Sequence, residues 1–416
     1  MPTLRPSDLD TLATAVVDSI AVALDPDAPQ SGLYYWECAR PFTGAVVEAV
    51  RDAEDPAVRE LGRALIADPS DAGRYAALRE ALKAPEAQGP GLDRIFDLAW
   101  QSECNNRLGH HVGAAYTAKE SVVTVEELRT LPPGPGLPAG ADPEVLIVVP
   151  FRDRDTGGAR LRNLLACLQS LRDQSFPRER YQVTVVESDS FPRWRDVIEP
   201  YADNYLFAPK ASTFNKSWVV NVGVVHSPGH SEVISILDAD VLADREFVER
   251  NATRFERPGT MGHLTYRNML CLDTPSSQRA IKERLWDCAG QPDLDRLRGY
   301  TLRRGPGCSL WVRTSAFHRI DGMDERYEGW GGEDIDFNYR FDFANAYDSY
   351  DDPLLHLRHP PASALREDGE LTNAHIPPLS WKPEEPIGRI DRFAHEFTER
   401  AERGDSAERA AAVEAA

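Results

Sequence analysis

The sequence is poor in basic residues and in paired cysteines. Its 416 residues contain 47 Lys and Arg against 67 Asp and Glu, which gives a net charge of −20. A surface of this sign repels nucleic acids and anionic membranes, so neither is expected as a partner. The six cysteines are scattered without a Cys-x-x-Cys pair, and Cys167 and Cys308 lie in apolar patterns typical of small core residues. Reduced thiols of a cytoplasmic protein are therefore expected.

Long hydrophobic runs are absent as well. The most apolar N-terminal stretch, residues 12–24, contains Asp18 and is shorter than the about 20 residues that span a bilayer. It also lacks the basic region of a signal peptide. With no transmembrane segment and 42% hydrophobic residues, the chain is expected to be a soluble protein with a packed core.

The composition divides the chain into four segments. Residues 1–130 carry apolar side chains at helical spacing and are expected to be mostly helical. Residues 131–143 are rich in Pro and Gly, which is typical of a linker. We expect an α/β domain over residues 144–360, followed by a C-terminal extension and charged tail over residues 361–416.

Short β-branched runs alternate with helical patterns in the α/β segment. The predicted strands and helices are, in chain order, Val145–Val149, residues 161–171, Val183–Val186, residues 216–225, Val233–Leu237, Cys308–Val312 and a helix that begins near Glu333. This alternation predicts a Rossmann-like α/β fold with a mostly parallel sheet and helices on both faces. Ligands are expected beyond the carboxyl ends of the strands.

Two carboxylates follow the third predicted strand directly. Asp238 and Asp240 supply hard oxygen ligands at the carboxyl edge of the sheet, where a divalent cation could bridge a diphosphate. The alternative is an ordinary solvated turn, in which Asp is common. Either His356 or His359 could be a third ligand of such a cation, although single histidines are more often structural.

Basic side chains lie at two further places, after the first predicted strand and at the beginning of a predicted helix. Arg152 and Arg154 are expected to follow the first strand, where they could pair with phosphate groups or form ordinary surface charge. Residues 213–216 lead into a predicted helix with Lys216 at its beginning. Free amides and a cation at a helix N-terminus can bind an anion, and ordinary capping is the alternative.

The segment Gly329-Trp-Gly-Gly-Glu-Asp334 is the most informative one. Glycines surround Trp330 at a conformational cost that a close approach to a ligand would explain. The Trp330 ring offers an apolar plate for a sugar. Glu333 and Asp334 are expected to open a helix whose dipole keeps a carboxylate ionised, as a general base requires. Acidic capping is the alternative, but it does not explain the glycines.

Six motifs occur in one order over residues 145–360, namely VPFRDR, TFNKSWVVNVG, LDAD, GPGCSLWVRTSAF, GWGGEDIDFNYR and LRHP. Together they resemble GT-A glycosyltransferases, most closely the family-2-like and β-1,4-galactosyltransferase group. The resemblance implies a GT-A fold, a UDP-sugar donor and a divalent cation, Mg²⁺ or Mn²⁺. Residues 1–130 resemble no known family.

The resemblance also implies roles for individual residues. The donor nucleotide would be held by Pro150, Phe151, Arg152, Arg154, Lys216 and Asp238. The cation would be held by Asp240 together with His359 or His356. The transferred sugar or the acceptor would be bound by Trp330, Gly331, Gly332 and Glu333, and Asp334 would be the catalytic base.

Two positions distinguish the chain within this resemblance. Lys216 stands where the galactosyltransferases carry Arg, so the donor contacts differ there. Asp334 stands where retaining relatives that transfer GalNAc to proteins carry Asn, which favours inversion.

The implied activity is a metal-dependent inverting transfer of a hexose, glucose by hypothesis, to a hydroxyl of a small soluble acceptor. An aminocyclitol natural product such as validoxylamine A is one candidate. The alternative within the class is galactosyl or N-acetylhexosaminyl transfer to a polysaccharide or glycan. Two alternatives lie outside this class. A sugar nucleotidyltransferase is disfavoured because the glycines of the loop after the first strand come only at its end. A non-catalytic carbohydrate-binding protein is disfavoured because Asp240 and Asp334 are both present. The N-terminal region is expected to shape the acceptor site or a homo-oligomer interface.

Overall fold

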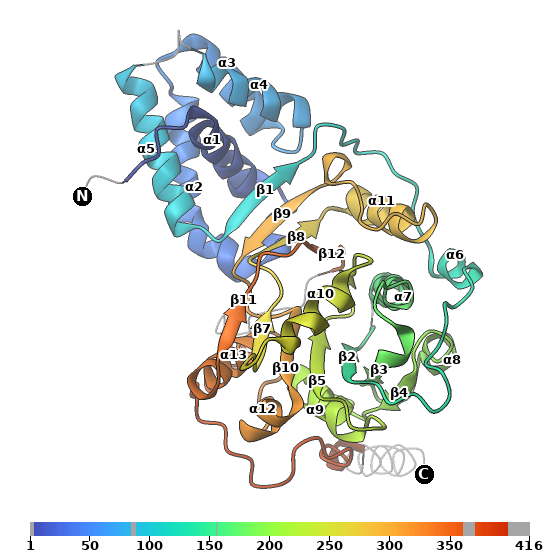
Figure 1. The fold of residues 1–416 in the computed structure, drawn as a ribbon. Helices are drawn as coiled ribbons and strands as arrows, with labels where there is room; N and C mark the ends of the chain where they lie inside the picture. The colour runs from blue at the N-terminus through green and yellow to red at the C-terminus, as the bar shows by residue number, and fades with distance from the viewer. Residues whose placement is uncertain (1–3, 85–88, 155, 361–370, 398–416) are drawn as a thin grey trace, which may run out of the picture.

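A bundle of helices lies beside two β-sheets in the computed structural model, which describes residues 4–84, 89–154, 156–360 and 371–397 (Figure 1). The helices of the bundle are α1 (Leu9–Leu24), α2 (Leu33–Arg51), α3 (Pro56–Ala67), α4 (Ala72–Lys83) and α5 (Pro90–Asn105). Three of them begin at an aspartate whose carboxylate accepts a hydrogen bond from a main-chain N–H of the first turn, and these caps are Asp8, Asp55 and Asp71. The bundle has its own apolar core, which confirms the predicted N-terminal helical region.

The main sheet has seven strands in the order β11-β7-β10-β5-β2-β3-β4. Its strands are β2 (Val145–Phe151), β3 (Tyr181–Glu187), β4 (Asn204–Phe207), β5 (Val233–Leu237), β7 (Gly262–Leu264), β10 (Ser309–Arg313) and β11 (Tyr347–Ser349). Strands β5, β2, β3 and β4 are parallel, whereas β10 runs antiparallel to both of its neighbours. The predicted α/β fold with a mostly parallel sheet is therefore confirmed.

Helices cover both faces of this sheet, as predicted. Alternate side chains of β2 belong to two different apolar clusters, because successive residues of a strand point to opposite faces. One cluster includes the apolar residues of α7 (Ala159–Arg172), and the other includes those of α9 (Lys216–His226). The remaining helices are α6 (Val125–Thr130), α8 (Arg195–Ile198), α10 (Phe247–Thr253), α11 (Thr274–Leu285), α12 (Thr314–Arg319) and α13 (Glu333–Ala344).

A second sheet of five strands joins the bundle to the main sheet, and the sequence patterns did not predict it. Its order is β1-β9-β8-β12-β6, with β1 (Leu108–Val112), β6 (Val241–Leu242), β8 (Asn268–Leu272), β9 (Arg298–Arg303) and β12 (Leu354–His356). Strand β1 comes from the N-terminal region and pairs with β9. The short strand β12 lies between β8 and β6, so it brings the end of the chain's α/β segment to the loop after β5.

Two sequence-based details need correction. Pro150 and Phe151 are the last residues of β2 and do not follow it. Proline has no main-chain N–H and therefore cannot donate a hydrogen bond to a neighbouring strand. It is tolerated at position 150 because β2 pairs with β5 only as far as Val148, so the β5 side needs no donor there. The strand predicted from Cys308 begins one residue later, at Ser309.

All six cysteines are free thiols, and Cys167 is buried in the main core as predicted. Within the described ranges, no helix combines the length and the apolar composition that crossing a membrane requires. The predicted tail beyond Arg400 and the beginning of the predicted C-terminal extension, residues 361–370, lie outside the described residues.

Candidate active site

The turn Asp238-Ala239-Asp240 lies at the carboxyl end of β5, at the centre of the predicted site. The main-chain N–H of Asp238 donates to the carbonyl of Cys308, at 2.9 Å, which ties the turn to the beginning of β10. The N–H of Val241 closes the turn onto the carbonyl of Asp238, at 3.2 Å. The two carboxylates of the turn face different partners.

Asp240 contacts both candidate histidines. Its Oδ1 lies 3.2 Å from Nε2 of His356, and its Oδ2 lies 2.8 Å from Nε2 of His359. The cluster forms because His356, the last residue of β12, is the register partner of Val241 in β6. Spacing in the sequence left open which histidine accompanies Asp240, and the structure brings both to it.

The donor set of this cluster suits a divalent cation. One ligand atom from each of Asp240, His356 and His359 lies within 4.8 Å of the others. Nδ1 of His359 lies 2.8 Å from the carbonyl of Pro360, and donation from this nitrogen leaves the Nε2 lone pair free to bind a metal. Oδ1 of Asp240 is buried, and its 3.2 Å contact with Nε2 of His356 does not have the geometry of a hydrogen bond. A cation would satisfy this oxygen.

Electrostatics hold Asp240 in its charged form. Burial opposes ionisation, but the two imidazoles outweigh it and keep the pKa of the Asp240 carboxyl well below its usual range. Only the ionised carboxylate is a strong metal ligand, and a metal also requires both imidazoles in their neutral form.

Buried polar side chains position the segment that carries the two histidines. The N–H of Leu357 donates to the carbonyl of Asp240, at 2.8 Å. Asn163, which is fully buried on α7, donates to the carbonyl of Leu357, at 3.3 Å, and to that of Arg358, at 3.2 Å. Sequence reasoning missed Asn163, although a polar residue in the apolar stripe of a helix was a visible signal.

Lys216 connects the other carboxylate of the turn to the predicted base. Its Nζ lies 2.8 Å from Oδ1 of Asp238 and 3.1 Å from Oδ2 of Asp334. Burial alone would lower the pKa of Lys216, but the two carboxylates raise it well above its usual range. The ammonium group therefore stays charged between them. The sequence placed Lys216 at the helix start correctly but did not reveal this pairing.

Glu333 and Asp334 begin α13, as predicted, and both are partly buried. Burial, followed by the charge of Asp334, raises the pKa of Glu333. Burial also raises the pKa of Asp334, and Lys216 partly opposes that effect. Gly307 permits this packing, because a Cβ at that position would lie 2.0 Å from Oδ2 of Asp334.

The glycine loop before α13 presents Trp330 at the surface. The Trp330 side chain is 36% exposed, which leaves part of its ring available to a sugar. Gly332 has a φ of 100°, in the left-handed region that favours glycine. Asn373 holds the loop from the C-terminal segment by donating to the carbonyls of Glu328, at 2.9 Å, and Gly331, at 2.7 Å. No sequence motif indicated Asn373.

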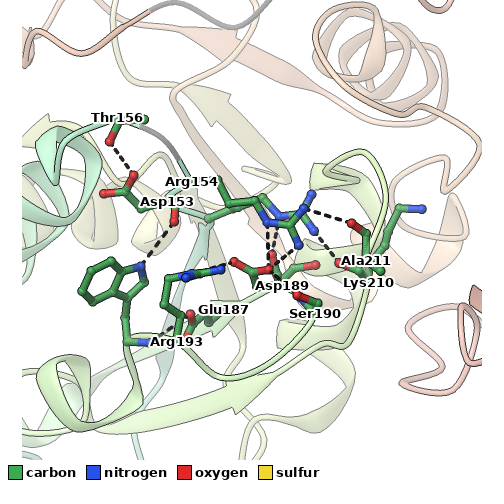
Figure 2. A network of polar contacts seen from close by, with 12 residues as sticks. Asp153, Arg154, Thr156, Glu187, Asp189, Ser190, Arg193, Lys210 and Ala211 are labelled. Atoms are coloured by element: carbon green, nitrogen blue, oxygen red, sulfur yellow. Dashed lines mark hydrogen bonds and ion pairs between the residues drawn. The ribbon is translucent and has the colours of Figure 1, made fainter. Parts of the chain in front are cut away.

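The arginines at the end of β2 are engaged by the protein itself. Arg152 donates to the carbonyls of Ser188, at 2.6 Å, and Ser212, at 2.7 Å. Arg154 contacts Asp189 and donates to the carbonyl of Ala211, at 2.9 Å, as Figure 2 shows. Both arginines thereby join the end of β2 to the loop before α9. Their role in nucleotide binding stays a prediction.

The neighbouring predicted residues differ in exposure, and one carboxylate was missed. Phe151 is 2% exposed and packs in the main core, so its side chain is not accessible to a ligand. Asp189 is buried at the carboxyl end of β3 and pairs with Arg154 and Arg193 (Figure 2). Burial opposes ionisation, but Arg154 and the other donors lower the pKa of Asp189 to about 2. The acidic residues after the second predicted strand were the signal that could have identified it.

Two protein-family models match the chain. Residues 146–321 match the family described as glycosyl transferase family 2, and residues 298–347 match the family described as the N-terminal domain of galactosyltransferase. The matched residues include the Asp238–Asp240 turn, Lys216 and the Trp330–Asp334 segment. Both matching models describe glycosyltransferases, which favours this class over the alternatives of a nucleotidyltransferase and a non-catalytic binding protein.

Solved structures with some similarity include S. aureus TarS, at 17% identity over 51% of this chain and 60% of that chain, with a TM-score of 0.38. Drosophila β1,4-galactosyltransferase 7 in complex with xylobiose is 18% identical over 59% of this chain and 77% of that chain, with a TM-score of 0.30. A variant of the same Drosophila enzyme, at 18% identity and a TM-score of 0.29 over 58% of this chain and 76% of that chain, contains manganese, UDP-Gal and xylobiose. No curated protein sequence matches the chain.

Proposed function

We propose that this glycosyltransferase transfers a hexose from a UDP-sugar to a hydroxyl group with inversion at the sugar carbon, and that it depends on a divalent cation. One observation carries the proposal. The Asp238–Asp240 turn has a metal-binding cluster on one side and the ionised pair of Lys216 and Asp334 on the other. Neutralisation of a leaving group and removal of a proton can therefore occur at one edge of the sheet.

Asp240, His356 and His359 would hold the cation. When bound, the cation would supply positive charge that neutralises the leaving diphosphate. Two imidazole nitrogens in the donor set favour Mn²⁺ over Mg²⁺, because Mg²⁺ prefers oxygen ligands and retains its waters. Lys216, which lies beside Asp238, can add a second positive charge at the same edge of the sheet.

Asp334 is the proposed base that takes the proton from the acceptor hydroxyl. An inverting transfer needs one base on the acceptor side, and the contact with Lys216 favours the ionised form of Asp334. Glu333 has a raised pKa and can donate a hydrogen bond from its protonated form to a sugar hydroxyl. The exposed ring of Trp330 can stack on the sugar or on the acceptor.

The N-terminal region contributes a side chain that senses the charge of Asp334. Tyr35 of α2 has a raised pKa, mainly through burial, and the charge of Asp334 contributes to that shift. The Arg107 guanidinium lies over the Tyr35 ring, 5.5 Å from its centroid. An aminocyclitol such as validoxylamine A is a candidate acceptor. Glucose is the proposed sugar, and the match of residues 298–347 to a galactosyltransferase model favours galactose as the second candidate.

Thermal unfolding tests the donor and the cation together. The protein is heated with UDP, GDP or dTDP, each with and without Mn²⁺. A ligand at 100 times its Kd stabilises a protein by about 2.7 kcal/mol, which is a shift of several degrees in Tm. We expect a shift with UDP that requires Mn²⁺. An equal shift with all nucleotides, or a UDP shift that Mn²⁺ does not change, would contradict the proposal.

A further inference from the structure

Arg358 lies between the two histidines of the metal-binding cluster, and each of its polar groups is bound by a different part of the chain. Its N–H donates to Oγ of Ser277 in α11, at 2.8 Å. Its carbonyl accepts from Asn163 in α7, at 3.2 Å. Its guanidinium donates to Oδ1 of Asp27, at 3.0 Å, and to Oε1 of Gln30. The main chain between the two metal ligands is thus held from three directions.

Asp27 and Gln30 belong to the connection between α1 and α2, residues 25–32, in the helical N-terminal region. This connection is itself attached to the second sheet. The carboxylate of Asp25 pairs with Arg298 of β9, and both side chains are buried. The Sγ of Cys271 donates to the carbonyl of Ser31, at 3.9 Å. Cys271 is the register partner of His356 in the pairing of β8 with β12, so the connection lies against the strand next to a proposed metal ligand.

We propose that the α1–α2 connection positions the metal site, with Asp27 and Gln30 as positioning residues that act through Arg358. The inference rests on the proposed metal-dependent function. A planar guanidinium that binds two acceptors has few orientations left, so it restricts the main chain that carries it. A cation then binds ligands that are already ordered and loses less free energy in arranging them. The α1–α2 connection would thereby take part in catalysis without touching either substrate.

A purely structural role makes a different prediction. Arg358 is 17% exposed and Asp27 is 37% exposed, and partly exposed ion pairs contribute little to stability. If the contact only joined two surfaces, its loss would leave the affinity for a metal unchanged. Partners outside the ligand sphere that orient metal ligands typically affect metal affinity about 10–100-fold. The affinity for a cation therefore separates the two roles.

The test measures binding of Mn²⁺ to the full chain by calorimetry and by the loss of the free Mn²⁺ electron paramagnetic resonance signal, with and without UDP. The variants are Arg358→Met and the double variant Asp27→Asn with Gln30→Ala. Arg5→Met is the matched control, because it removes a guanidinium with two carboxylate partners inside the bundle, away from the cluster. We expect about tenfold weaker Mn²⁺ binding for Arg358→Met and for the double variant, and no change for the control.

Arg358→Lys gives a second readout, because it keeps a positive charge that can reach Asp27 and should recover part of the affinity. Unchanged Mn²⁺ affinity in both Arg358→Met and the double variant would overturn the inference. If Arg358→Met does not fold, the double variant decides alone. A wild-type chain that binds no Mn²⁺, even with UDP, would overturn the inference and the metal dependence together. Weakened Mn²⁺ binding in a protein that UDP does not stabilise would support the positioning role and contradict the proposed donor.

Discussion

The two sides of the Asp238–Asp240 turn have opposite effects on the carboxylates that they contain. On the metal side, two imidazoles keep the pKa of Asp240 well below its usual range. On the base side, burial raises the pKa of Asp334 although Lys216 opposes it. Neighbouring positive charge lowers the pKa of a carboxyl group and keeps it ionised, whereas shielding from water raises the pKa, so that the group takes up a proton more readily. One short turn thus separates a group suited to hold a cation from a group suited to accept a proton.

The largest expected effect is on the base side. Asp334→Asn keeps the size of the side chain but cannot accept a proton, so transfer should fall by about 10³-fold, within the usual range for a general base. Mn²⁺ affinity and the UDP-dependent shift in Tm should stay unchanged, because the metal cluster is separate. Release of UDP from the UDP-sugar, with and without acceptor, measures the loss. The control is Asp342→Asn, an exposed position on the same helix. Near-normal turnover would remove Asp334 from the role of base.

Asp240→Asn should have the next largest effect, on the metal side. It removes the negative charge of the one carboxylate in the cluster. The loss of a partner that only orients a ligand weakens metal binding by about 10–100-fold, and we expect Mn²⁺ binding to weaken by more than this. The metal-dependent UDP shift in Tm should disappear as well. Treatment of the wild type with EDTA should mimic the variant, and activity that survives EDTA would contradict the metal assignment.

Lys216 offers a way to increase the difference between the two sides. Asp334 works as a base only when ionised, so the transfer rate should fall as the pH falls through its raised pKa. Lys216→Met removes the cation that lowers this pKa, and the acid limb of the pH–rate profile should therefore move to higher pH. Lys216→Arg keeps the charge and should leave the limb near its wild-type position. An acid limb that does not move in Lys216→Met would show that another group controls it.

The smallest expected effect concerns the glycine loop. Asn373→Ala removes the hydrogen bonds that hold the carbonyls of Glu328 and Gly331. Each such bond contributes about 1 kcal/mol net, so the loss of both costs about 2 kcal/mol, and we expect a KM for the acceptor that is up to about 30-fold higher, with Mn²⁺ affinity unchanged. Asn105→Ala, at an exposed position of the bundle, is the control. A change in kcat alone would show that the loop does not orient the acceptor.

Regular strands and helices of the catalytic segment could be predicted because they bury continuous apolar patterns. Strand β5 lies at the predicted residues, and α13 begins at the predicted Glu333. The short strands β6 and β12 could not be predicted, because two or three residues carry no measurable periodicity. Their pairing with each other joins segments more than a hundred positions apart in the sequence. For the same reason no local pattern indicated Asn373.

The sequence by itself determined the chemistry that is available to this protein. It supplied the carboxylates of the Asp238–Asp240 turn, the two nearby histidines, and the acidic start of a helix after a glycine loop with one tryptophan. Only the tertiary structure decided how they combine: both histidines meet Asp240, while Lys216 joins Asp238 to Asp334. The physical reason is that spacing along a strand or helix decides which way a side chain points, whereas the pairing of distant strands decides what it meets.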